Sequence, residues 1–169
     1  RTLVIFTSDH GDMMASHHCL GKSIPAFYEN ILNIPLVMRL PGIIKAGTVV
    51  KEPVSSVDIM PTILDYLGME APDGIHGRSL RPLIEGKKVK WRKYSFCERT
   101  DPDNGVVQRM IRSDRWKYCF HNHQENQLFD MEKDPIETEN LFGRQGFESV
   151  IKDMHDELCN WMESTDDPY

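Results

Sequence analysis

A short apolar run near the start of the chain constrains its fold more than any other feature. Leu3-Val4-Ile5-Phe6-Thr7 is rich in residues that favour β-structure, which is typical of a strand covered on both faces in a parallel α/β sheet. Strands of this kind end in loops that bind ligands. The next residues are Ser8-Asp9-His10-Gly11, so a carboxylate and an imidazole follow directly where a ligand would bind.

The first half of the chain continues as a mixture of helices and strands. Apolar spacing and Gly or Pro punctuation predict each element. Ser56 is a suitable N-cap for the longest helix, and Gly68 a suitable C-terminal stop. The predicted elements are a helix over Ile24–Leu32, a strand over Ile34–Leu40, an extended piece over Val49–Ser55, a helix over Val57–Leu67 and a helical turn over Ser79–Ile84.

The second half has a different pattern, with short strands separated by turn signals. An amphipathic helix over about Phe147–Met162 should pack on the sheet that these strands form. We place a boundary near Gly86, with part of an α/β domain in residues 1–86 and a small subdomain in 87–169. The strands are predicted over Tyr94–Glu98, Val106–Arg112, Trp116–His121 and Gln127–Met131, as an antiparallel meander.

Composition excludes some classes of function. The net charge of -6 argues against a nucleic-acid partner, because phosphate binding needs a concentrated basic face. No apolar run reaches the roughly 20 residues of a membrane helix. The four cysteines are widely spaced, so they suggest neither a zinc ribbon nor a dense disulfide framework, and the compartment stays open, a periplasmic or secreted parent included.

The loop after the first strand carries the chemistry. Asp9 and His10 offer hard oxygen and nitrogen donors for a divalent metal, and Gly11 lets the backbone turn away beneath them. Lys22 can bring a point charge back over a bound anion. For these residues alone, the simpler interpretation is a capping aspartate, a surface histidine and a solvated lysine.

The order of motifs along the chain resembles that of the sulfatases, in the alkaline-phosphatase-like superfamily. The resemblance continues into the second half through Arg115-Trp116-Lys117-Tyr118 and Gln127-Leu128-Phe129-Asp130. In the first half it rests on Ser8-Asp9-His10-Gly11, Leu20-Gly21-Lys22, Tyr28-Glu29, Pro41-Gly42, Val54-Ser55-Ser56-Val57-Asp58-Ile59-Met60-Pro61-Thr62 and Gly77-Arg78-Ser79-Leu80.

The resemblance implies roles for the loop residues. Asp9 and His10 would be ligands of a divalent cation, usually calcium in sulfatases, although a histidine ligand keeps manganese or another divalent metal open. Lys22 would contact the sulfate and the leaving-group oxygen. His17 either lines the opening of the same site or is a loop histidine held by a local hydrogen bond. Ala15 and His18 stand where the family usually has glycine.

Several cations and histidines of the second half have two interpretations. His123 lies in a predicted loop between strands, where it could read substrate or simply face solvent. Arg109, Arg112 and Lys117 could meet an acidic sugar or form cross-strand pairs.

The sulfatase nucleophile motif is missing. The family makes a formylglycine from Cys or Ser within Cys/Ser-x-Pro/Ala-x-Arg, and no such segment occurs. Arg1 is followed at once by a strand, so we expect the chain to be a C-terminal sulfatase fragment, inactive alone, that self-associates or needs its N-terminal part. The intact protein would hydrolyse sulfate esters of sugars or aryl compounds. The alternatives are a phosphonate- or phosphate-ester hydrolase of the same superfamily, or a noncatalytic binding module.

Overall fold

The chain has a mixed α/β fold with two antiparallel sheets and a C-terminal helix. The computed structural model describes residues 2–22 and 27–169. These form two compact units, one of Arg1–Ser8 with Pro35–Lys93 and one of Asp9–Ile34 with Tyr94–Tyr169. The division at residue 86, which concerns the intact catalytic domain, stays a prediction.

The first unit contains a two-stranded sheet. Strand β1 (Val4–Thr7) pairs antiparallel with β2 (Leu36–Arg39), with Val4 opposite Arg39 and Thr7 opposite Leu36. The expectation of a parallel-rich sheet is therefore wrong for the part of the chain that the structure describes. An apolar run indicates burial on two faces but says nothing of strand direction, which depends on the partner strand.

One face of this sheet is uncovered. Val4, Phe6 and Val37 are 48%, 64% and 59% exposed, and Phe6 stands directly opposite Val37. Apolar side chains of this size usually face a partner surface.

Helix α2 (Ile59–Leu67) follows a short 3-10 turn, η2 (Ser56–Asp58). Ser55 forms a capping box with Asp58, so the cap lies one residue before the predicted Ser56. Gly68 ends α2 at φ 70° as predicted, because glycine reaches the left-handed region without a Cβ clash. The piece over residues 49–55 is not a strand, and α3 spans Arg81–Ile84.

Asp58 accepts hydrogen bonds from several separate parts of the first unit and so forms its polar centre. It is fully buried, and Arg92 binds its two carboxylate oxygens at 2.6 and 3.0 Å. The same carboxylate accepts the backbone N–H groups of Ser55 and Arg78, both at 2.9 Å. Gly77 is required beside this centre, because a Cβ there would lie 1.9 Å from the carbonyl oxygen of Val57.

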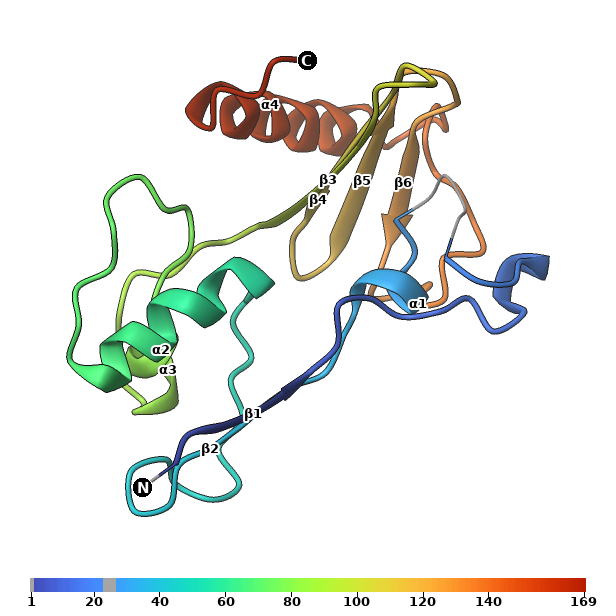
Figure 1. Cartoon of the computed structure of the whole chain (residues 1–169). Coiled ribbons are helices and arrows are strands. Elements are labelled where there is room, and N and C mark those ends of the chain that lie inside the picture. Colours follow the sequence, from blue (N-terminus) through green and yellow to red (C-terminus); the bar gives the residue numbers. More distant parts are fainter. Residues whose placement is uncertain (1, 23–26) are drawn as a thin grey trace. The chain divides into compact units, whose positions relative to one another are not determined.

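The second unit is an antiparallel meander with a helix on one face. Its strands are β3 (Ser95–Asp101), β4 (Val106–Arg112), β5 (Trp116–His121) and β6 (Gln127–Asp130), in that order across the sheet. Helix α4 (Glu148–Ser164) packs against β4 and β5 (Figure 1). The prediction of a meander with a packed helix is confirmed.

The two faces of this sheet have different compositions, because successive side chains of a strand point to opposite sides. Ile111, Tyr118 and Leu128 join the apolar core beneath α4. The opposite face carries Met110 beside Cys119, and these pack against Phe27. Strand alternation also puts the neighbouring pair Arg112 and Lys117 on that face.

Helix α1 (Glu29–Leu32) is a single turn next to Phe27. The start of the predicted helix, residues 24–26, lies outside the described residues. All four cysteines are free thiols. Within residues 2–22 and 27–169, none of the helices has the length and apolar character needed to cross a bilayer.

Candidate active site

The loop that carries Asp9 and His10 rests on α1. The backbone N–H of Gly11 donates to the carbonyl oxygen of Ile31 at 2.8 Å. A Cβ on Gly11 would lie 1.9 Å from the carbonyl oxygen of Asn30, so only glycine fits. The requirement for Gly11 thus comes from this close approach, and not only from the sharp turn that the sequence suggested.

Two neighbours of His10 favour one tautomer of its ring. Its Nδ1 lies 2.8 Å from the carbonyl oxygen of Gly11, which can only accept. Its Nε2 lies 2.6 Å from the Lys22 ammonium, which can only donate. These two contacts fit the tautomer with its proton on Nδ1, in which the Nε2 lone pair can bind a cation.

Asp9 stands beside the same lone pair. One of its carboxylate oxygens, Oδ2, lies 3.4 Å from His10 Nε2, and its side chain is 82% exposed. The other oxygen, Oδ1, accepts the backbone N–H of His10 at 2.9 Å. The structure brings Asp9, His10 and Lys22 together, as the sequence predicted.

This arrangement fits part of a divalent-metal site. Histidine ligands commonly donate their second ring N–H to a backbone carbonyl, and His10 Nδ1 lies 2.8 Å from such an oxygen, that of Gly11. Asp9 adds a carboxylate oxygen, so the two residues could supply two ligands. No cluster of three or more His, Cys, Asp or Glu suited to a metal occurs in the described ranges 2–22 and 27–169.

The loop between His10 and Lys22 includes non-glycine residues whose backbone is left-handed. Ala15 and His18 have φ angles of 72° and 58°, in the left-handed region. These are the two positions at which the sequence departs from the family pattern. The loop therefore keeps a left-handed path there, at a conformational cost.

His17 is held by an aromatic contact. Its ring stacks on Tyr28 with centroids 3.9 Å apart and planes 12° apart. Burial raises the pKa of Tyr28 above its usual value. The stack gives His17 a local packing partner, the alternative that the sequence left open, while its catalytic role stays untested.

His123 lies among the hairpin turns of the meander. It is exposed, and its Nε2 is 2.9 Å from the carbonyl oxygen of Gly105. This contact belongs to the turn between β3 and β4, and not to the loop of Asp9 and Lys22. A substrate-reading role for His123 therefore stays a prediction.

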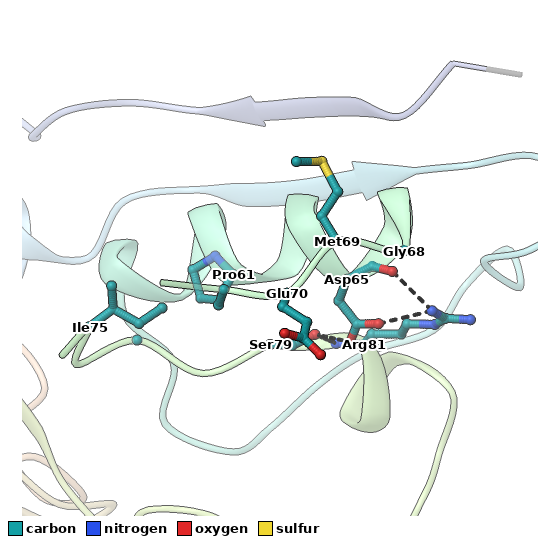
Figure 2. A pocket seen from close by; sticks show the side chains of 10 residues that line it. Pro61, Asp65, Gly68, Met69, Glu70, Ile75, Ser79 and Arg81 are labelled. Atoms are coloured by element: carbon teal, nitrogen blue, oxygen red, sulfur yellow. Dashed lines mark hydrogen bonds and ion pairs between the residues drawn. The ribbon is translucent and has the colours of Figure 1, made fainter. Parts of the chain in front are cut away.

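The first unit contains a separate hollow of about 480 Å³ beside α2 (Figure 2). Met69 and Ile75 line it with apolar surface. Asp65, also in its wall, binds Arg81 at 2.9 Å and Ser79 at 2.5 Å. Because these polar groups already pair with one another, the hollow is a weak candidate for a catalytic site.

Comparison with known proteins decides the family. A model of the N-sulphoglucosamine sulphohydrolase C-terminal region matches residues 22–164. The chain belongs to the sulfatase family. It corresponds to a sulfatase C-terminal region, in the alkaline-phosphatase superfamily.

Relatives of this sulfatase chain extend well beyond it. It is 34% identical to an arylsulfatase of Clostridium perfringens, over 99% of the chain and 35% of that protein. A solved structure bound to its substrate D-glucosamine-2-N,6-O-disulfate has 30% identity and a TM-score of 0.89, over 99% of this chain and 35% of that one. Phosphonate monoester hydrolase of Agrobacterium radiobacter has 32% identity and a TM-score of 0.86, over 97% and 35% of the two chains. The chain thus spans about a third of the length of these relatives.

The sequence did not reveal the role of Lys117. Lys117 is fully buried, and its Nζ lies 2.9 Å from Glu29 Oε1 and 2.7 Å from Glu137 Oε1. A lysine between Trp116 and Tyr118 in a strand was the available signal, but its partners are remote in sequence. Arg109 similarly pairs with Asp167 at 2.5 Å. Lys117 and Arg109 thus both have carboxylate partners within the chain, which favours a structural role over binding of an acidic sugar.

Proposed function

We propose that this chain supplies part of the metal and anion site of a sulfuric-ester hydrolase. In the proposal, Asp9 and His10 are metal ligands and Lys22 binds the sulfate and the leaving-group oxygen. The single observation that supports it best is the position of His10 Nε2, which lies 2.6 Å from Lys22 Nζ and 3.4 Å from Asp9 Oδ2. The family membership of the chain supports the reaction class.

The residues of the chain would act through charge. The Lys22 ammonium is exposed and can form charge-assisted hydrogen bonds with a sulfate oxygen or with the departing ester oxygen. His10 and Asp9 hold their donors ready through bonds to Gly11 and to the His10 backbone. A divalent cation, with calcium as the family default and manganese as the alternative, supplies charge neutralisation at the sulfate when bound.

We propose that the nucleophile, a formylglycine, belongs to another part of the intact protein. Burial raises the pKa of the Cys119 thiol to about 12, which makes it a poor nucleophile, and no cysteine of the chain lies in the formylglycine motif. The 169-residue chain alone is then expected to be inactive. We also propose that β1 and β2 join a larger, parallel-rich sheet in the intact protein, in a catalytic domain that includes residues 1–86.

The substrate class is proposed from the relatives. The solved relative binds a disulfated glucosamine, and a curated relative is named arylsulfatase, so sulfated sugars or aryl sulfates are the candidates. Phosphonate monoesters are the second candidate class, because a phosphonate monoester hydrolase is also similar to the chain, with 32% identity.

An assay of the intact protein with 4-nitrophenyl sulfate and with a 4-nitrophenyl phosphonate monoester separates these classes. We expect the sulfate to be preferred, and Asp9→Ala and Lys22→Met each to lower kcat/KM by at least about a hundredfold, as for lost transition-state charge stabilisation. A preference for the phosphonate would favour the second class. Full activity of both variants would refute the assignment of the site.

A noncatalytic binding or assembly module is the third alternative, and one observation favours self-association of the chain. The exposed face of Val4, Phe6 and Val37 is apolar, and β1 and β2 form only a two-stranded sheet. Light scattering on the chain tests for self-association. A stable monomer argues against it, and a dimer that Phe6→Ser disrupts supports it.

A further inference from the structure

Four charged side chains form a cluster under α1. Lys117 Nζ lies 2.9 Å from Glu29 Oε1 and 2.7 Å from Glu137 Oε1. Arg112 Nε lies 3.6 Å from Glu29 Oε1. The Lys117 side chain is 0% exposed and that of Glu137 1%, whereas Arg112 and Glu29 are 25% and 24% exposed. Two cations and two carboxylates thus balance one another, one pair of them in the interior.

Such a cluster is a poor way to gain stability. Removing charges from water costs several kcal/mol per ion, and well-packed apolar residues of similar volume are often as stable or more so. Burial raises the pKa of Glu137 above its usual value, which indicates this cost. Glu137 also has a φ of 58°, in the left-handed region. The cluster is therefore better explained by the arrangement that it imposes than by the stability it adds.

The arrangement that the cluster imposes is the position of α1. Glu137 Oε2 accepts the backbone N–H of Glu29, the first residue of α1, at 2.7 Å. Lys117 holds the side chain of the same residue. A helix of a single turn has little stability of its own, so these contacts determine where α1 lies on the sheet.

The loop of the candidate site is supported by the opposite end of this turn. Ile31 accepts the N–H of Gly11, and Asn30 touches Gly11 too closely for any Cβ. The carbonyl oxygen of Gly11 in turn lies 2.8 Å from His10 Nδ1, within hydrogen-bond distance. A continuous series of contacts thus runs from Lys117 through Glu29 and α1 to the ring of His10.

We propose that Lys117, with Glu29 and Glu137, is a positioning residue that holds α1 beneath Gly11 and thereby selects the Nδ1-protonated form of His10. The meaning of this for metal binding rests on the proposed function, whereas the effect on His10 does not. A displacement of α1 would let Gly11 move, and His10 would lose the acceptor that selects its tautomer.

The test is nuclear magnetic resonance on the 15N-labelled 169-residue chain at about pH 8, where an ordinary histidine is neutral. Long-range 1H–15N correlations report which ring nitrogen carries the proton, and His10→Gln identifies the His10 signals among the seven histidines. We expect wild type to show protonated Nδ1, and Lys117→Met to show a mixture of tautomers with faster hydrogen exchange at the Gly11 amide.

Two further variants keep the result interpretable. Glu29→Gln removes one charge at a residue whose side chain is 24% exposed, so it decides the question if Lys117→Met fails to fold. Arg109→Met is the matched control, because Arg109 is equally buried on the opposite face of the sheet and pairs with Asp167. It should lower stability without changing His10.

The proposal fails if His10 keeps its tautomer in folded Lys117→Met or in Glu29→Gln, or if Arg109→Met shifts it equally. Calorimetry with manganese gives an independent readout. We expect Lys117→Met to weaken binding roughly tenfold, the low end for residues that act through a ligand. If Asp9→Ala leaves manganese binding unchanged while the tautomer responds as described, the metal assignment is wrong and the positioning role stands.

Discussion

Replacement of Asp58 by alanine should destabilise the first unit strongly. The substitution leaves Arg92 without its bidentate partner and removes the acceptor of the Ser55 and Arg78 N–H groups. Breaking a buried ion pair costs about 3–5 kcal/mol, and the lower end applies because the Arg92 side chain is 16% exposed and can reach water. We expect the free energy of unfolding of the first unit to fall by about 3 kcal/mol. This corresponds to an increase of roughly a hundredfold in the population of the open state, in which the unit is locally unfolded.

Hydrogen exchange measured by mass spectrometry localises this effect. Exchange at the amides of α2 should accelerate by roughly a hundredfold, because slow exchange there depends on the equilibrium population of the open state. Asp65→Ala is the matched control in the same unit, since its pair with Arg81 is 36–38% exposed and should contribute less than about 1 kcal/mol. If Asp58→Ala accelerates α2 no more than Asp65→Ala does, the central role of Asp58 is refuted.

Two other predictions concern the second unit. Ala15→Gly should raise the free energy of unfolding by about 0.5–1 kcal/mol, because alanine is strained at φ 72° and glycine is not; an unchanged or lower value in urea titrations would contradict a left-handed Ala15. The Arg109 guanidinium holds the pKa of Asp167 below its usual value, so their pair stabilises the fold above about pH 4, the ordinary aspartate range, and less below it. The stability difference between wild type and Asp167→Asn should therefore shrink between pH 7 and pH 3, and a constant difference would exclude this linkage.

Local patterns account for the elements that the sequence predicted well. The four strands of the meander and helix α4 follow from periodicities of 2 and 3.6 residues, which depend only on neighbours along the chain. Gly68 ended α2 as expected, since its left-handed conformation is a property of one residue. The proximity of Asp9, His10 and Lys22 came from the family resemblance, and the structure agrees with it.

Features that depend on distant partners could not be predicted. The direction of β1 relative to β2 is a relation between two strands, which the apolar run of β1 does not contain. The burial of Lys117 results from Glu29 and Glu137, neither of which is near it in sequence. Tyr28 likewise gave no sign that it would stack on His17.

The long span of the contacts under α1 has a consequence for biosynthesis. Glu29 meets Lys117 and Glu137 across separations of 88 and 108 residues. At about 5–20 residues per second, a ribosome takes on the order of 5–20 s to add the later partner after the earlier one. The support of the segment with Asp9 and His10 is therefore complete only after Glu137 has been synthesised. Nascent chains interrupted before Glu137 would carry both proposed ligands yet leave them unorganised, so metal loading is expected to be a late event in maturation.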